Sequence, residues 1–182
     1  MLVSEREAAG ILAGAGLARE PARRLLKAGF AGVPLRTRSA LLYDEDRVRE
    51  LVEREPVTER ELAATCPRGA FVLRMGQGVD VAAPFTEQLD RLRLTWWLSP
   101  WARVRIGDAV RRRGWYPFLV TVSGFVAFAG DVTDLVPSDG DRDTSLVVAD
   151  PSGWAEALPG RRLAHRGAGP WMLWPTPARL QQ

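Results

Sequence analysis

Apolar residues recur at helical spacing twice near the start of the chain, over about residues 5–13 and 19–28. The two apolar stripes are Ala8, Ala9, Ile11 and Leu12, then Ala22, Leu25, Leu26 and Gly29. Because positions three, four and seven residues apart share one side of a helix, the spacing predicts two amphipathic helices. Glycines in the segment between them, residues 14–18, predict a turn.

Two short segments carry the same signal for the start of a helix. Ser4 is followed three residues later by Glu7, and Thr58 is followed three residues later by Glu61. This spacing predicts a capping box, in which the hydroxyl accepts the third helical amide and the glutamate reaches back to the cap amide. The sequences after the two boxes diverge, and the second helix should stop near Pro67. We therefore interpret the similarity of the two segments as one helix-start signal that occurs twice. The alternative is the remnant of a duplicated domain.

The pattern changes to strands and then returns to a helix. Residues 33–36 and 40–43 read as two short strands around a polar turn. Asp44 can cap a third helix over residues 45–54, which has acids in its first turn. The predicted order is helix, turn, basic helix, β-hairpin, helix.

The rest of the chain mixes both kinds of pattern. The spacing of Phe85, Leu89, Leu92 and Trp96 predicts a helix over residues 84–98, joined by a tight corner to a helix from Ser99-Pro100 to residue 113. The expected strands are residues 70–76, 117–122, 125–130, 144–150 and 171–175, with a hairpin through Ser123-Gly124. The expected class is α+β, with domains over residues 1–55 and 70–182 and a helical linker over 56–69.

Composition narrows the class of protein. The chain has 182 residues, of which 46% are apolar, so a substantial core is expected. No apolar run approaches the ~18 residues of a membrane span. Acids near the start do not fit a signal peptide, and the single cysteine, Cys66, fits a reducing compartment. We expect a cytoplasmic protein with no membrane association.

The net charge of +3 hides a local basic region. Between residues 19 and 38 there are six basic residues and one acid, Glu20. A basic helix followed by a basic hairpin is the electrostatic pattern of a DNA-binding protein. The alternative is an ordinary solvated helix face, on which Glu20 and Arg24 form a surface ion pair.

Residues 1–55 also resemble the winged helix-turn-helix of the MerR and excisionase-like DNA-binding families. The matching positions are Ser4, Glu7-Ala8-Ala9, Leu12, Gly14, Arg24-Leu25-Leu26 and Gly29, with residues 33–43 as the wing. In this chain the turn is longer than usual, and Ala18 stands where a Ser or Thr normally caps the second helix. The resemblance implies binding to double-stranded DNA, in transcription regulation or in an architectural role in recombination.

Individual roles follow from the chemistry of arginine and lysine. Arg23 is the best candidate for a base contact, because arginine pairs bidentately with guanine, and Arg19 is expected to share that role. Phosphate contacts are assigned to the remaining four basic residues, Arg24, Lys27, Arg36 and Arg38. The competing function is a protein-interaction adaptor that uses the helix-turn-helix as a docking module.

The second half carries little chemistry of its own. All seven tryptophans lie there, at positions 96, 97, 101, 115, 154, 171 and 174. Most are expected in the core, and some in a homodimer, partner or ligand surface. A second basic group, Arg91, Arg93, Arg103, Arg105 and Arg111–Arg113, is expected to be a solvated face, with extra nucleic-acid contact as the alternative.

Catalysis is not expected from this composition. The chain has one histidine, His165, and one cysteine, Cys66, too few for a Cys/His metal site. A catalytic Cys–His pair would have to bring together residues about 100 positions apart. The prediction is therefore a DNA-binding protein that is not an enzyme and has no metal or cofactor.

Overall fold

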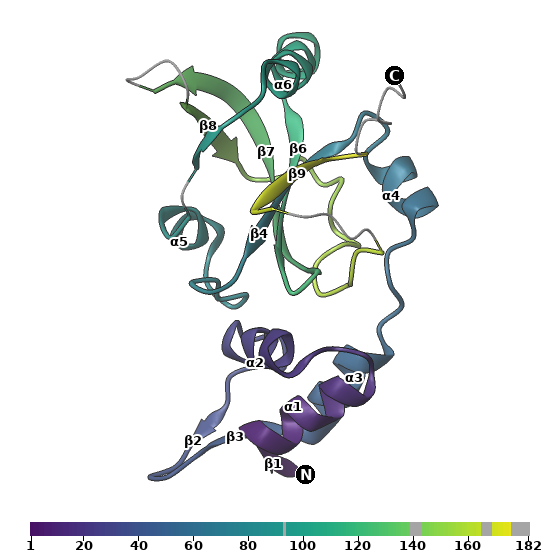
Figure 1. Cartoon of the computed structure of the whole chain (residues 1–182), viewed down its shortest axis with the longest axis vertical. Coiled ribbons are helices and arrows are strands. Elements are labelled where there is room, and N and C mark those ends of the chain that lie inside the picture. Colours follow the sequence, from purple (N-terminus) through teal and green to yellow (C-terminus); the bar gives the residue numbers. More distant parts are fainter. Residues whose placement is uncertain (93, 139–142, 165–168, 176–182) are drawn as a thin grey trace.

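The computed structural model describes residues 1–92, 94–138, 143–164 and 169–175. It shows a smaller N-terminal unit, residues 1–55, and a larger unit built around a curled sheet, connected by the chain that leads into α4 (Figure 1). His165 and Arg93 lie outside the described residues.

The N-terminal unit combines three helices with a small sheet. The helices are α1 (Glu5–Gly14), α2 (Arg19–Lys27) and α3 (Glu45–Glu53), and the strands are β1 (Leu2–Ser4), β2 (Leu35–Arg36) and β3 (Leu41–Asp44). The three predicted helices and the predicted hairpin are therefore confirmed. The strand β1 was not predicted; it pairs with β3 in the order β1-β3-β2. Its partner is about forty residues away in the chain, so no local signal marks it.

Both predicted capping boxes are present. Ser4 and Glu7 cap α1, and Thr58 and Glu61 cap α4 (Glu59–Thr65) by the same reciprocal hydrogen bonds. The α4 helix ends at Thr65, one residue before Cys66 and two before Pro67, as the proline predicts. The position that caps α2 is Ala18, and it makes no side-chain cap hydrogen bond.

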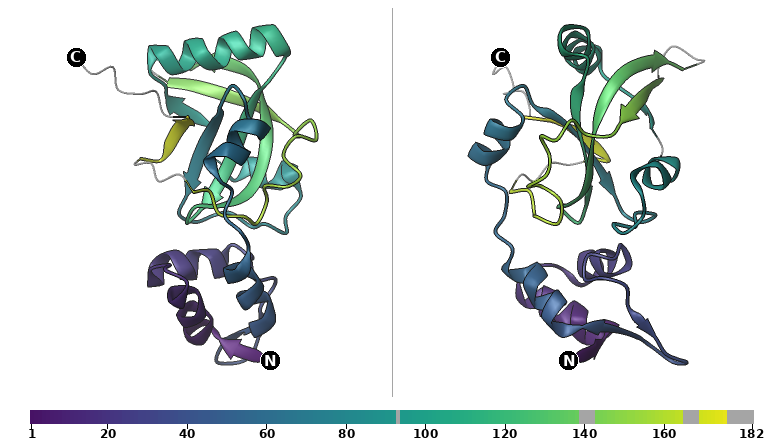
Figure 2. Two further views of the ribbon diagram at one scale, coloured as in Figure 1. Left: turned by 90° about the vertical axis from the view of Figure 1, so that its right-hand side faces the viewer. Right: turned by 180° about the vertical axis from the view of Figure 1, so that it is seen from behind.

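The larger unit contains a six-stranded mixed sheet. Its strands are β4 (Ala70–Met75), β5 (Thr95–Trp97), β6 (Tyr116–Val122), β7 (Phe125–Pro137), β8 (Asp143–Ala149) and β9 (Trp171–Trp174). Their order is β5-β8-β7-β6-β4-β9; β4 and β6 are parallel, and the other neighbours are antiparallel. The sheet curls (Figure 2). The pairing of β7 with β8 shifts register between Val132 and Asp134. The expected mixed α+β class is confirmed.

One predicted helix was wrong. Residues 84–98 do not form a single helix, because α5 (Phe85–Asp90) ends early and residues 95–97 form β5. Threonine and tryptophan favour an extended backbone, and pairing with β8 supplies the hydrogen bonds that a helix would have made. The predicted corner between two helices is therefore also wrong, although α6 (Pro100–Arg113) starts after Ser99 and stops before Gly114 as expected.

Both faces of the central strands are buried. Phe71 and Leu73 of β4 pack into one apolar cluster, while Ala70 and Val72 pack into a second cluster on the other face. Such strands need continuous apolar sequence rather than alternation. Val57 and Leu62 belong to the second cluster, so the expected linker 56–69 packs against the sheet. We therefore call residues 56–175 the C-terminal unit.

The two units share a packed junction. The rings of Phe30 and Phe125 meet edge to face, with centroids 6.0 Å apart. The Val81 amide donates to the Ala28 carbonyl at 2.9 Å, and the Ser123 hydroxyl donates to the carbonyl of Pro21 at 2.9 Å. One buried apolar cluster contains residues from both units, so α2 is held from both sides.

The tryptophans only partly follow the expectation that most are core. Trp174 is buried and four others are half-buried, whereas Trp97 and Trp101 are exposed and are the two available for a surface contact. In the part of the chain that the structure describes, no helix has both the length and the hydropathy to cross a bilayer.

Candidate nucleic-acid interface

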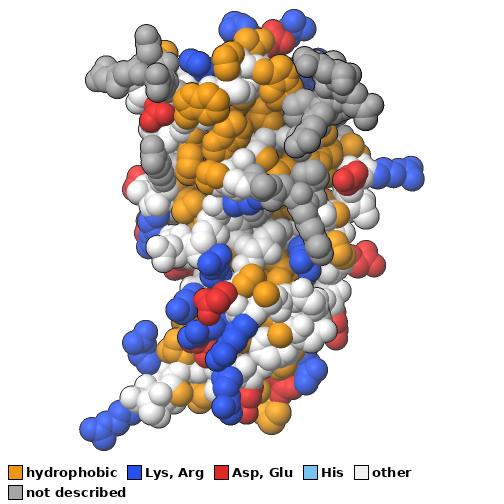
Figure 3. Space-filling view, viewed as in Figure 1, with side chains coloured by type: hydrophobic (Ala, Val, Ile, Leu, Met, Phe, Trp, Pro, Cys, Tyr) orange, Lys and Arg blue, Asp and Glu red, His pale blue; other side chains and the backbone are white. Residues whose placement is uncertain are grey.

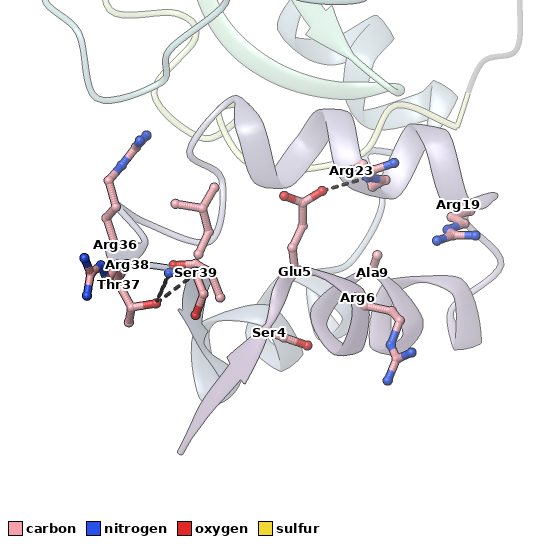
Figure 4. Close-up of a pocket in the computed structure, with 12 residues that line it drawn as sticks. Ser4, Glu5, Arg6, Ala9, Arg19, Arg23, Arg36, Thr37, Arg38 and Ser39 are labelled. Atoms are coloured by element: carbon pink, nitrogen blue, oxygen red, sulfur yellow. Dashed lines mark hydrogen bonds and ion pairs between the residues drawn. The ribbon is translucent and has the colours of Figure 1, made fainter.

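A concave surface of about 540 Å³ lies between α1, α2 and the β2–β3 hairpin (Figure 4). The start of α1 forms one wall, the exposed side of α2 forms another, and the turn of the hairpin closes one end. Five arginines line it: Arg6, Arg19, Arg23, Arg36 and Arg38. Glu5 is the one acidic residue in the lining, so the surface is strongly cationic. We call it the arginine face.

Arg23 is fixed in place by acids on both of its sides. Its Nε donates to Glu5 at 2.7 Å, and its terminal nitrogen lies 3.4 Å from a carboxylate oxygen of Glu20. The hydrogen bond to Glu5 raises the pKa of Arg23 above its usual value. Glu5 comes from α1 and Arg23 from α2, so the pair also ties the two helices together. This orientation was not predictable from spacing, because the two residues are 18 positions apart.

The turn of the hairpin is shaped by Thr37. Its amide donates to the Ala40 carbonyl at 2.9 Å, and its hydroxyl accepts from the amide of Ala40 at 3.0 Å. These bonds close the turn and present Arg36 and Arg38 from either side of Thr37. Thr37 lies in the polar turn that the sequence predicts, and no local pattern marks it as part of a site.

The other four arginines of the arginine face are not held in ion pairs by the described residues. Arg6, Arg19, Arg36 and Arg38 are all exposed, and none forms an ion pair with another described residue. Several like charges on one concave surface raise the local potential and attract polyanions. Figure 3 shows Lys and Arg side chains spread over the N-terminal unit and its projecting hairpin.

The structure divides the six predicted DNA-contact residues between two places. Arg19, Arg23, Arg36 and Arg38 meet on the arginine face. Arg24 and Lys27 instead line a separate hollow beside the C-terminal unit.

Sequence reasoning missed Arg6 altogether. It lies in the first turn of α1, on the side opposite the apolar stripe, and it lines the arginine face together with Arg19. The only available signal was its polar position on an amphipathic helix. Only the packing of α1 against α2 brings the two arginines to the same surface.

Part of the second basic group is paired with acids, and one further arginine is held by uncharged groups. Arg91 lies 3.6 Å from Glu87, and Arg112 hydrogen-bonds Asp108 at 3.0 Å. Arg105 donates to the Arg68 carbonyl at 2.8 Å, and its guanidinium lies 5.1 Å from the centre of the Trp101 ring. Arg105 and Arg112 line one concave surface of about 610 Å³, which also contains Asp108, the acid paired with Arg112.

Catalytic and metal-binding groups are sparse in the described part of the chain. Cys66 is buried, and burial raises the pKa of its thiol to about 12, so the thiol stays protonated at neutral pH. Among the described residues, no group of three or more His, Cys, Asp or Glu side chains is arranged to hold a metal ion.

Comparisons with protein-family models, with curated proteins and with solved structures find no match for this chain. The geometry and charge of the arginine face are therefore the features of this chain that point to a function.

Proposed function

We propose that residues 1–55 are a winged helix-turn-helix that binds double-stranded DNA, with α2 in the major groove and the β2–β3 hairpin as the wing. The observation that supports this most strongly is the arginine face. It brings together five arginines from α1, α2 and the β2–β3 hairpin. Four of the five have no ion pair with a described residue. A purely structural role would not need so many uncompensated charges on one surface.

The proposal assigns different tasks to the two ends of the face. Arg36 and Arg38 project from a hairpin and suit phosphate contacts, which set affinity and register. Arg19 lies in the first turn of α2, the part of a recognition helix that approaches base edges. Arg6 adds a phosphate contact from α1.

Glu5 has a positioning role in this proposal. It binds the Nε of Arg23 and so orients the guanidinium, whose outer edge would approach a guanine once one terminal nitrogen exchanges Glu20 for the base. A carboxylate at a DNA interface also repels phosphates. The variant Glu5→Gln should therefore bind random duplexes a few-fold more tightly. The ratio of its affinity for the best genomic duplex to its affinity for random duplexes should fall. If this affinity ratio were unchanged, Arg23 would not be a residue that contacts bases.

The test is fluorescence anisotropy of the full chain with random and genomic duplexes over a range of salt concentrations. Each lost phosphate contact lowers the log–log salt slope by about 0.9. Arg36→Ala/Arg38→Ala should lower it by about two, and Arg19→Ala should weaken discrimination between sequences. The matched control is Arg60→Ala/Arg113→Ala, which removes two exposed arginines from the C-terminal unit.

Two other functions remain as outcomes of the same experiment. If the full chain binds no duplex at low salt, the N-terminal unit is a docking module for another protein. If it binds genomic and random duplexes with nearly equal affinity, an architectural role like that of the excisionases replaces transcription regulation. A homodimer formed through the C-terminal unit would predict binding to paired half-sites.

A further inference from the structure

Arg24 and Lys27 extend from α2 toward the C-terminal unit rather than toward the arginine face. They line a hollow of about 380 Å³, whose opposite wall is the turn Gly76-Gln77-Gly78. The Arg24 guanidinium lies close to this turn: its nearest nitrogen is 3.9 Å from the position that a Cβ atom on Gly76 would occupy. Two separate parts of the chain therefore build this hollow.

The two cations in the hollow are uncompensated. Arg24 and Lys27 are exposed, and neither has an ion pair with another described residue. Glu20 also lines the hollow, but its carboxylate contacts Arg23. The hollow therefore presents two free positive charges and one carboxylate that is already engaged.

The opposite wall suits an anion. The turn follows β4, which runs parallel to β6, so the carboxyl ends of both strands face α2. Residues 76–78 are exposed, and two of the three are glycines, so a ligand can approach the backbone closely. Gly78 has φ +84°, a left-handed conformation that other residues adopt only with strain.

The hollow also continues toward the hairpin. Lys27 and Gly78 line a neighbouring cavity of about 810 Å³, whose far side includes Arg36. Arg24, Lys27 and Arg36 thus border two adjacent cavities. The second cavity is also lined by Asp80 and Arg91, whose charged groups lie 4.0 Å apart. Figures 1 and 2 show the hairpin, the end of α2 that leads into it and the loop after β4 on the same side of the molecule.

We propose that Arg24, Lys27 and the Gly76–Gly78 turn together bind a phosphate group, and that in the DNA complex this group is a backbone phosphate. The C-terminal unit is then part of the DNA interface, because it supplies one wall of the phosphate site. This inference rests on the proposed function, and it adds a contact that the winged helix-turn-helix alone does not have.

The experiment changes the charge of the turn without touching α2. Gln77 is exposed and lines the hollow, so Gln77→Glu and Gln77→Lys alter charge at nearly constant size. Duplex binding is measured by anisotropy against salt with the full chain. Gln77→Glu should weaken binding several-fold. Gln77→Lys should strengthen it and raise the salt slope by about one.

Opposite effects of the two Gln77 variants would exclude misfolding as the cause, because damage to the fold weakens binding in both. Arg24→Ala/Lys27→Ala should lower the salt slope by about two. If both Gln77 variants bind like wild type while Arg36→Ala/Arg38→Ala still weakens binding, the inference fails and the proposed function stands. If none of these variants changes binding, both fail.

A second arm separates DNA from a free anion. Inorganic pyrophosphate is titrated into the full chain by calorimetry. If pyrophosphate binds weakly and the duplex affinity of Arg24→Ala/Lys27→Ala is reduced, the result supports a DNA backbone phosphate as the ligand of this site. Tight binding of pyrophosphate that is lost in this variant, with duplex affinity unchanged, would overturn the assignment in favour of a small phosphorylated ligand.

Discussion

The arginine face of the N-terminal unit and the acid-paired arginines of the C-terminal unit use the same residue in opposite ways. In the N-terminal unit most arginines of the concave surface have no ion pair with a described residue, and they come together from three elements. In the C-terminal unit, Arg91 and Arg112 are paired with nearby acids, and Arg161 binds Glu61 at 3.1 Å. Arginine content alone therefore does not indicate nucleic-acid binding. What matters is whether the charges are neutralised locally.

The units also differ in what stabilises them. The N-terminal unit has short helices and two- to four-residue strands, and its core is completed at the junction by Phe125. The C-terminal unit buries both faces of its central strands. We infer that the smaller unit depends on the larger one for stability, and the following changes test this, starting with the largest effect.

The largest expected effect is in the core of the sheet. Phe71 is fully buried, and its ring stacks on Phe118 at 5.9 Å and on Trp171 at 5.4 Å. Phe71→Ala should lower the free energy of unfolding by about 3–5 kcal/mol, through lost burial and the cavity it leaves. Urea unfolding followed by circular dichroism measures this. A loss under about 1 kcal/mol would show that the sheet is not the stabilising core.

The junction is tested by Phe30→Ala. This change removes the ring contact with Phe125, so the N-terminal unit should unfold before the C-terminal unit. All tryptophans lie in the C-terminal unit, and their fluorescence therefore reports that unit alone. In wild type the fluorescence and circular-dichroism transitions should coincide. In the variant the circular-dichroism transition should come first; coincident transitions would show that the junction does not couple the units.

The two capping boxes allow a matched test of how much each cap contributes to the free energy of unfolding. The Glu7 amide donates to the Ser4 hydroxyl at 3.3 Å, and the Glu61 amide donates to the Thr58 hydroxyl at 3.1 Å. Ser4→Ala and Thr58→Ala should each cost about 1 kcal/mol of stability. The double variant should show the sum, since the sites share no partners. A clearly larger loss in the double variant, in urea unfolding, would indicate coupling between the boxes.

The smallest expected effect is a difference in acid sensitivity. Hydrogen bonds from Arg161 lower the pKa of Glu61 below its usual 4.5, and the Ser4 amide lowers the pKa of Glu7. A lowered pKa means that each carboxylate stabilises the fold above about pH 4.5 and loses this effect as the pH falls through its folded-state pKa. Melting temperatures between pH 6 and 3 should fall less steeply in Glu61→Gln than in wild type. Glu7→Gln, which removes no ion pair, should show the smaller change, and the reverse order would contradict the assignment.

The sequence by itself determined the elements that depend on neighbouring residues. Serine, threonine and aspartate caps fixed the starts of α1, α3, α4 and α6, because a side chain bonds an amide only two or three residues away. Continuous apolar runs marked the central strands, and Ser123-Gly124 marked the hairpin, where both residues have positive φ. The basic character of residues 19–38 was also visible from the sequence.

Only the tertiary structure decided what depends on distant partners. Residues 95–97 became a strand because β8 was available to pair with them, against a helical pattern. Packing of α1 on α2 placed Arg6 on the arginine face and bound Arg23 to Glu5. The junction turned Arg24 and Lys27 toward the turn after β4. Local hydrogen bonds can be read along the chain, whereas the surface on which each charge lies is set by contacts between residues far apart in sequence.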